Sequence, residues 1–376
     1  MQVLDSGRLS AGPMMAQFER DFAELHGHHF GLMSNSGTSA LQIALAACKE
    51  RHGWQDGDEV IVPAVTFIAT SNVVVYNNLR PVFVDVEPGY YCIDPARIEA
   101  AITPRTRAIM PVHIAGLPCD MAPIVEIAAR HHLRILEDSA EAMFVHYRGR
   151  PVGSFSDIAS FSTYVAHIIS TGVGGLNTTS DPEYQTLLRS LANHGRDSIY
   201  TRIDDDQGRQ GRALFEIANR RFSFVRFGQS YRSTEMEAAL GIAELEQRHE
   251  YHARRCQIVA AFQAGLARFT EHLQLPAVRP ECEHAWMFYP LTVRSDAFPR
   301  AALIQFLEER GVETRYLLPL ISQPLYRARF GNLDDQCPVA SWLNERAFAI
   351  GCHPQITDEE VSWVLETFAD FFASRA

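Results

Sequence analysis

The alternation of short β-rich runs with helix-like stretches between about residue 30 and residue 180 restricts the possible folds more than any other feature. Strands that alternate with helices at this spacing predict an α/β fold with a parallel, doubly wound sheet. In such sheets, ligands bind beyond the carboxyl ends of the strands, so we expect functional side chains just after strands. The candidate strands are 59–65, 81–86, 108–114, 133–138 and 157–163, and the helix-like segments are 38–53, 94–102 and 121–132.

The second half of the chain shows a different pattern. Residues 200–235, rich in Arg, Asp, Gln and Gly, predict an exposed excursion, and a long helical pattern that begins at residue 233 predicts a bridge between two domains. From about residue 285, strand and helix patterns alternate again and predict a small α+β domain. A chain of 376 residues exceeds the size at which one hydrophobic core stops growing. We therefore expect a large domain over residues 1–250 and a small C-terminal domain over residues 251–376.

Composition excludes several classes of protein. The net charge of −11 argues against a protein that binds nucleic acid through its phosphate backbone. The chain contains no run of about 18 apolar residues that would span a membrane, and its first residues lack the pattern of a secretory signal. The 7 cysteines are scattered and form no CxxC pair, which favours reduced thiols over a disulfide frame, a metal site or an iron–sulfur cluster. We expect a cytoplasmic protein without a metal.

Hydroxyl residues and a glycine stand directly before an apolar helix, in the run Ser36-Gly37-Thr38-Ser39. Free N–H groups and hydroxyls at the positive end of a helix suit a phosphate group. An ordinary helix N-cap explains Ser and Thr at these positions as well. Both interpretations remain open from these residues alone.

Two carboxylates, Glu137 and Asp138, end a strand that is otherwise apolar. A carboxylate at this place can pair with a protonated pyridine nitrogen and make the ring a better electron sink. The alternative is an Asp that caps the following helix. Further along, Ser162 and His167 precede a glycine-rich turn at 172–175, which suits a phosphate site, although a lone His among apolar residues is more often structural than catalytic.

Together these segments resemble the DegT-type sugar-nucleotide aminotransferase family of fold-type I pyridoxal 5′-phosphate (PLP) enzymes. The resemblance covers about residues 10–372 and depends on many motifs in order, among them SNSGTSAL, VTFIATSN, LEDSAEA, DIASFST and YRSTEMEAAL. It implies a fold-type I PLP-dependent transferase with a mostly parallel sheet and a small C-terminal α+β domain. It also implies a homodimer with active sites at the subunit interface.

The resemblance implies a role for each matching residue. Gly37, Thr38 and Ser162 would hold the phosphate of the cofactor. The aromatic ring of Phe67 would stack on the pyridine, and Asp138 would bind the pyridine nitrogen. Glu141 stands where the family has a carboxamide or histidine near the phenolic oxygen, and Ser230 where many members have an Asn that reaches the partner subunit's phosphate. The cofactor-binding positions implied are Gly37, Thr38, Ser39, Phe67, Asp138, Glu141, Ser162 and Ser230, and the substrate-binding positions are Tyr164 and Arg315.

The family's Schiff-base lysine, five residues after the phosphate-binding Ser, is replaced here by His167. Lys49 is the only lysine of the chain, and it follows Thr38 by 11 residues. At a rise of 1.5 Å per residue it lies roughly 16 Å along the helix, too far to reach the ring. Imidazole cannot hold an imine, but its ordinary pKa near 6.5 suits a proton shuttle. We therefore expect PLP or pyridoxamine 5′-phosphate (PMP) to bind non-covalently.

Within this family, the same Lys-to-His exchange characterises sugar 3-dehydratases that act on nucleotide-linked 4-keto-6-deoxy sugars. The resemblance implies a PMP-dependent dehydratase in which His167 is the catalytic base, the substrate is a nucleotide-linked keto sugar, and glutamate restores the amine. Three alternatives remain open: a sugar aminotransferase that works without the lysine, a cofactor-binding protein without activity, and a different elimination or deoxygenation of a keto sugar.

Overall fold

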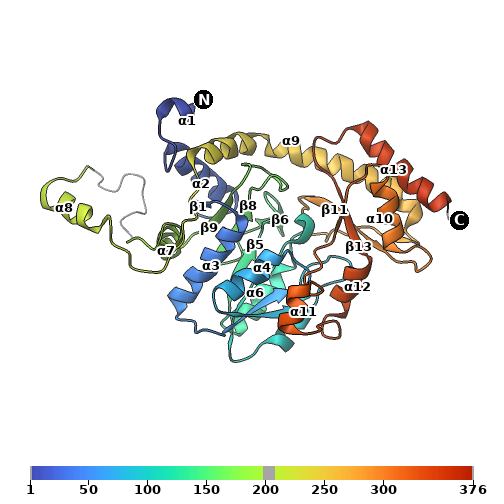
Figure 1. Ribbon diagram of the computed structural model, residues 1–376, viewed down its shortest axis with the longest axis horizontal. Helices are drawn as coiled ribbons and strands as arrows, with labels where there is room; N and C mark the ends of the chain where they lie inside the picture. Colours follow the sequence, from blue (N-terminus) through green and yellow to red (C-terminus); the bar gives the residue numbers. More distant parts are fainter. Residues whose placement is uncertain (1, 198–207, 375–376) are drawn as a thin grey trace.

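The computed structural model describes residues 2–197 and 208–374 (Figure 1). The central element is a sheet of 7 strands in the order β1-β9-β8-β5-β4-β2-β3. The strands from β8 to β3 are parallel, and β9 is antiparallel to both of its neighbours. The strands are β1 (Phe30–Ser34), β9 (Gly175–Thr179), β8 (Ile158–Ser162), β5 (Arg134–Asp138), β4 (Thr106–Ile109), β2 (Glu59–Pro63) and β3 (Arg80–Val84).

Helices cover both faces of this sheet, which explains why its strands are apolar throughout. In β2, Val60 and Val62 pack on one side with α3 (Gly37–His52), α4 (Ile68–Tyr76) and α7 (Pro182–Ala192). The intervening Ile61 packs on the other side with α5 (Pro95–Ile98) and α6 (Met121–Arg130), because successive side chains of a strand point to opposite faces. Helix α2 (Pro13–Leu25) packs near the β1 edge with Phe161.

The second sheet is small and antiparallel. Its strands lie in the order β10 (Leu273–Gln274), β11 (Phe288–Val293), β13 (Ala347–Gly351) and β12 (Thr314–Tyr316). Helices α10 (Arg300–Glu308) and α13 (Asp358–Ala373) pack against it. Helices α11 (Pro324–Phe330) and α12 (Pro338–Arg346) return toward the large sheet, where Ala340 and Leu343 join the core around Ile61.

Helix α9 (Glu235–Leu266) connects the two parts of the molecule (Figure 1). A capping box formed by Thr234 and Glu237 fixes its start. Leu245 packs near α2, whereas Phe262 and Leu266 belong to the core of the small sheet. The predicted bridging helix therefore forms. The domain division at residue 250 stays a prediction, and this position lies inside α9.

The fold class predicted from the sequence is confirmed, with corrections at two segments. Strand β4 ends at Ile109, so the predicted strand 108–114 is too long, and beyond it Val112 makes only an isolated bridge with Asp138. The predicted helix 94–102 is a short α5 followed by the 3₁₀ turn η1 (Glu99–Ala101). Part of the predicted excursion, 198–207, lies outside the described residues. The remaining elements are α1 (Gln2–Ser6), η2 (Ile114–Gly116), the β6/β7 hairpin (His146–Tyr147, Arg150–Pro151), α8 (Gly211–Arg220) and η4 (Ala267–Phe269).

Helix α8 projects at one edge of the molecule and buries none of its residues (Figure 1). Among the described residues, no helix combines the length and the apolar character needed to cross a membrane. In the same part of the chain, no group of three or more His, Cys, Asp or Glu side chains is arranged to hold a metal ion.

Candidate active site

Polar side chains gather at the carboxyl ends of the parallel strands, where the sequence predicted them. Asp138 ends β5 and Ser162 ends β8, while α3 begins just after β1 and α4 begins after β2. Because these strands are neighbours in one sheet, their ends converge. This edge of the sheet is the candidate site.

The start of α3 lies directly against Ser162. A Cβ atom added to Gly37 would lie 2.7 Å from the Ser162 Cβ and 3.1 Å from its Oγ, so only glycine fits there. Ser36 caps the helix by accepting a hydrogen bond from the Ser39 N–H at 3.1 Å. The first turn of a helix leaves backbone N–H groups without intrahelical partners. Gly37, Thr38 and Ser162 thus form a small polar cradle suited to an anion.

Asp138 is buried, with a polar partner on each carboxylate oxygen. The Thr70 hydroxyl donates to Oδ2 at 2.7 Å, and the Ala140 N–H donates to Oδ1 at 3.2 Å. Burial raises the pKa of this carboxyl, and the hydrogen bonds from Thr70 and Ala140 oppose the rise. A cation beside Asp138 would lower that pKa and restore the charge. Thr70 lies on the first turn of α4, and Phe67 is the exposed N-cap of that helix.

His167 lies in the loop that follows β8. Its backbone N–H donates to the Tyr164 carbonyl at 2.9 Å, and the backbone of Ala140 lies near enough to the ring to raise its pKa. That contact places the imidazole against the turn that carries Asp138. Burial lowers the pKa of His167 to about 4, so the ring is neutral at neutral pH. Its Nδ1 atom is buried and makes no hydrogen bond in the described protein, which leaves it available to a ligand.

The His167 loop is closed at its base. The Thr163 and Thr171 hydroxyls lie 2.6 Å apart, and the Thr171 N–H donates to the Thr163 carbonyl at 2.9 Å. At Gly174 an added Cβ would lie 2.4 Å from the Thr163 Oγ1, so this glycine is required. Helix α9 supports the loop from outside, because Glu244 accepts a hydrogen bond from the Ser170 N–H at 3.0 Å.

Glu141 is buried three residues after Asp138. The Ala115 N–H donates to its Oε2 at 2.6 Å, and Ala115 itself adopts a left-handed backbone with φ of 59°. Burial, together with the nearby Asp138 charge, raises the pKa of Glu141 to about 8, and the Ala115 hydrogen bond only partly offsets this. Glu141 therefore lies near Asp138, and its predicted place in the cofactor site stays a prediction.

The remaining predicted residues lie outside this cluster. Tyr164 shares the His167 loop, but its side chain is exposed. Ser230 is exposed, and its hydroxyl accepts a hydrogen bond from Arg232 at 3.1 Å. Arg315 lies on β12, where it pairs with Glu313 at the surface. These contacts do not join Ser230 or Arg315 to Asp138, and the predicted roles of both residues stay predictions.

Lys49 points away from the site. It lies near the end of α3 opposite to Gly37, where its Nζ contacts Asp56 at 2.5 Å and the Asn77 carbonyl at 2.7 Å. Lys49 therefore lies at the end of α3 away from the candidate site, as its distance from Thr38 in the sequence predicts.

Neither Thr70 nor the role of Glu137 was predicted from the sequence. The sequence feature that could have indicated Thr70 is its position, because a hydroxyl in the first turn of the helix after β2 lies at the carboxyl end of the sheet. Glu137 points away from the site, where the Gly153 and Phe155 N–H groups each donate to it at 2.9 Å and the His113 Nε2 lies 3.0 Å away. These donors outweigh burial and lower the pKa of Glu137. Glu137 thus anchors the strand that ends in Asp138.

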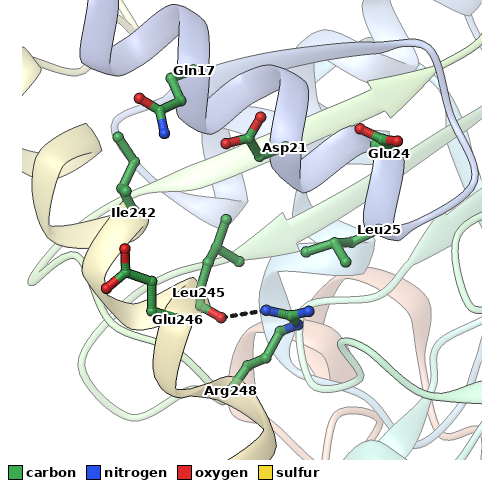
Figure 2. Close-up of a pocket in the computed structure, with 8 residues that line it drawn as sticks. All are labelled: Gln17, Asp21, Glu24, Leu25, Ile242, Leu245, Glu246 and Arg248. Atoms are coloured by element: carbon green, nitrogen blue, oxygen red, sulfur yellow. Dashed lines mark hydrogen bonds between the residues drawn. The ribbon is translucent and has the colours of Figure 1, made fainter.

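A separate shallow cavity of about 370 Å³ lies between α2 and α9 (Figure 2). Figure 2 shows Asp21 and Glu24 on α2 opposite Ile242 and Glu246 on α9. None of the predicted site residues lines this cavity, so it is distinct from the candidate site.

Comparison with known proteins identifies relatives over almost the whole chain. Residues 1–369 match the model of the DegT/DnrJ/EryC1/StrS aminotransferase family. A GDP-perosamine synthase of Caulobacter vibrioides is 38% identical over 95% of this chain and 89% of its own length. A dTDP-4-dehydro-2,6-dideoxy-D-glucose 3-dehydratase of Saccharopolyspora spinosa is 35% identical over 97% of this chain and 82% of its own length. The solved structure of E. coli GDP-4-keto-6-deoxy-D-mannose-3-dehydratase with bound hydrated PLP superimposes with a TM-score of 0.87 at 25% identity, over 97% of this chain and 94% of its own.

Proposed function

The chain belongs to the DegT/DnrJ/EryC1/StrS aminotransferase family, and we propose that it is a PMP-dependent 3-dehydratase of a nucleotide-linked 4-keto-6-deoxy sugar. The family resemblance read from the sequence motifs is confirmed. Enzymes of this family act on sugars with a pyridoxal cofactor, and the cofactor of this protein is PLP or PMP. Relatives include both aminotransferases and 3-dehydratases, so the choice between the two reactions depends on the site itself.

The residues of the candidate site fit a pyridoxal cofactor. Gly37 lies so close to Ser162 that no side chain fits there, and the free N–H groups of this helix start together with the Ser162 hydroxyl are suited to a phosphate. The buried carboxylate of Asp138 is suited to a protonated ring nitrogen. The buried Nδ1 of His167, without a partner, points to a further polar ligand at the same turn. When bound, the cofactor supplies an amine that condenses with a ketone and a ring that accepts electrons.

The single observation that carries the proposal is a histidine in place of the lysine. His167 contacts the Asp138 turn through Ala140, and the only lysine of the chain is bound to Asp56 at the far end of α3. No side chain of this protein can therefore hold the cofactor covalently, and we infer that PLP and PMP bind non-covalently. An imidazole that is neutral at neutral pH can accept and return the proton at the C4′ carbon of the cofactor.

The proposed reaction removes the hydroxyl group at C3 of the sugar. The C3–O bond would break and the oxygen would leave as water, with PMP supplying the two electrons for this reduction and losing its amine as ammonia. The product has a ketone at C4 and hydrogen in place of the C3 hydroxyl. Glutamate would supply the replacement amine and become 2-oxoglutarate. In this scheme Tyr164 and Arg315 contact the sugar nucleotide.

The proposed assembly is a homodimer with shared sites. The segment after α8 exposes large apolar side chains: Phe222 is 81% and Phe227 is 103% exposed, and Phe224 and Val225 are also exposed. Apolar surface of this kind is typical of a protein–protein interface. Ser230 follows directly and would face the partner's cofactor phosphate.

The test is turnover of PMP-loaded protein with GDP-4-keto-6-deoxymannose and glutamate, followed by mass spectrometry, with dTDP- and CDP-linked 4-keto-6-deoxy sugars in parallel. The proposal predicts a product with one oxygen atom fewer than the substrate, and His167→Asn should abolish it. A product that instead carries an amino group at C4 would establish the aminotransferase, which the similarity to GDP-perosamine synthase favours. Absence of turnover on all these sugars would contradict both reactions.

A further inference from the structure

Two buried hydroxyl groups lie in a row beside the carboxylate of Asp138. The Thr70 hydroxyl is 2.7 Å from Asp138 Oδ2, and the Thr66 hydroxyl is 2.7 Å from that of Thr70. Thr66 and Thr70 are 1% and 0% exposed, so water does not compete for these bonds. Both threonines follow the carboxyl end of β2, beside the candidate site, but the proposed reaction gives neither of them a role.

The hydrogen atoms in this row can point in only one direction while Asp138 is ionised. An ionised carboxylate has no hydrogen to give, so Thr70 donates to Asp138. A hydroxyl has one hydrogen, so Thr70 can only accept at its contact with Thr66, and Thr66 is the donor there. The two bonds form a directed chain that ends on the carboxylate. Each hydroxyl polarises the next, which strengthens the bond that reaches the charge.

The start of α4 explains why these hydroxyls are free to serve Asp138. Phe67 is the N-cap of the helix and has no polar side chain that could cap it, while Thr66 stands just before it and Thr70 lies in the first turn. Threonine hydroxyls near a helix start commonly bond the local backbone. Here the hydrogen bonds of both hydroxyls lead to Asp138 instead.

His113 faces Asp138 from the segment after β4, but it adds no positive charge there. Its backbone N–H donates to the Asp138 carbonyl at 3.3 Å. Its ring Nδ1 accepts the Cys119 N–H at 3.0 Å, and its Nε2 lies 3.0 Å from Glu137. A ring nitrogen that accepts a hydrogen bond carries no proton, so the His113 ring is neutral.

The two titratable groups on the other side of Asp138 add no positive charge either. Burial lowers the pKa of His167 to about 4, so its ring is neutral at neutral pH, and the carboxyl group of Glu141 can only add negative charge. The hydrogen bonds that stabilise the Asp138 charge are therefore those from Thr70 and the Ala140 N–H. The Thr70 bond is the shorter, 2.7 Å against 3.2 Å, so the threonine chain is the main support of this charge.

We propose that Thr66 and Thr70 are positioning residues that keep Asp138 ionised and oriented, so that the pyridine nitrogen of the bound cofactor stays protonated. Asp138 holds a protonated ring nitrogen only while its own charge persists, and a protonated ring is the better electron sink. Thr70 occupies one acceptor position on Oδ2 and the Ala140 N–H one on Oδ1, which leaves each oxygen a further position for the ring N–H. The inference rests on the role proposed above for Asp138 and does not involve the sugar.

The direct test is NMR of full-length protein loaded with PLP that carries nitrogen-15 in its ring, because the shift of this nitrogen reports whether it is protonated. Thr70→Val keeps the shape of the side chain without the hydroxyl, so its ring nitrogen should lose the proton at lower pH than in the wild type. Thr70→Ser should restore the wild-type titration, and Thr66→Val should fall between the two. The affinity of Thr70→Val for PMP should be about tenfold weaker at neutral pH. Identical titrations of wild type and Thr70→Val, or a Ser variant that behaves like the Val variant, would overturn the proposal.

Thr367 supplies the matched control. It is a threonine of equal burial in α13, and its hydroxyl donates to the Trp363 carbonyl at 2.7 Å within the core of the small sheet. Thr367→Val should leave the titration of the ring nitrogen unchanged, even where it lowers the stability of the protein. A shift as large as that of Thr70→Val would mean that general loosening moves the proton, which contradicts a role of the threonine chain.

A second measurement needs no cofactor. In protein labelled with carbon-13 at the side-chain carboxyl of aspartate, Asp138→Asn identifies the Asp138 resonance by removing it. Thr70→Val should move the titration of this resonance to higher pH, and Thr66→Val should move it in the same direction by less. Thr66→Val keeps the bond between Thr70 and Asp138, so it tests the chain even if Thr70→Val does not fold. An Asp138 titration that neither variant moves would overturn the proposal, whereas failure of the dehydratase assay leaves both measurements intact.

Discussion

Replacing Glu141 by Gln should make the cofactor-free protein more stable at neutral pH, although the residue lies in the candidate site. The pKa of Glu141 rises from 4.5 to about 8 on folding, so the folded state binds the proton more tightly than the unfolded chain. As the pH rises between these two values, the free energy of unfolding falls by about 1.4 kcal/mol per pH unit. The wild type therefore loses about 3 kcal/mol by pH 7 and about 5 kcal/mol above pH 8 relative to its value in acid.

Glutamine has the shape of the neutral acid but does not ionise, so the variant escapes this loss. Urea unfolding of both proteins, at equal concentration and at pH values from about 5 to about 9, measures the difference. The two stabilities should nearly coincide near pH 5 and separate as the pH rises, with the variant the more stable. Curves that run parallel across this range, or a variant that is less stable above pH 7, would refute the assigned protonation state.

Glu137→Gln is the matched control, and it should behave in the opposite way. Donors hold the pKa of Glu137 below its ordinary value, so its contribution to stability is complete above that value and is lost as the pH falls through the folded pKa. Removing this charge leaves His113 and two N–H groups with a poorer acceptor. We expect a loss of about 3 kcal/mol or more at pH 7, measured in the same unfolding series.

The remaining predictions concern the cradle, the histidine and the dimer. Gly37→Ala forces a Cβ into Ser162, so PMP affinity measured by calorimetry should fall at least tenfold, while Ser39→Ala should have a smaller effect. Burial lowers the pKa of His167 to about 4, so the folded protein should lose about 3 kcal/mol as the pH falls from about 6.5 to about 4, and His167→Gln should abolish that loss in acid unfolding. Phe227→Asp should convert a dimer into monomers in light scattering, and an unchanged mass would exclude this segment from the interface.

The sequence predicted the framework of the site because that framework depends on local patterns. The apolar strands, the Asp138 at the end of one of them and the Gly37 turn before an apolar helix are each visible within a few residues. The structure adds that Gly37 and Ser162 touch, although 125 positions separate them in the sequence. Only the sheet order, with β8 near the β1 edge, brings them together.

Features that depend on long-range packing were not predictable in the same way. Helices α11 and α12 are short, and nothing in their composition indicates that they return to the core of the large sheet. The environment of Glu141 depends on the backbone N–H of Ala115, which a left-handed φ aims at its carboxyl group. Glu137 and Glu141 look alike in the sequence, but their partners come from different segments and shift their pKa values in opposite directions.

The most direct test of the central claim is the mass of the intact protein after incubation with PLP and reduction by borohydride. Since His167 replaces the lysine and Lys49 is held by Asp56, the wild-type mass should not change, whereas His167→Lys should gain one reduced cofactor. A wild-type protein that gains one cofactor, with the label on Lys49, would contradict the account, because the chain would then have the covalent link that this site lacks.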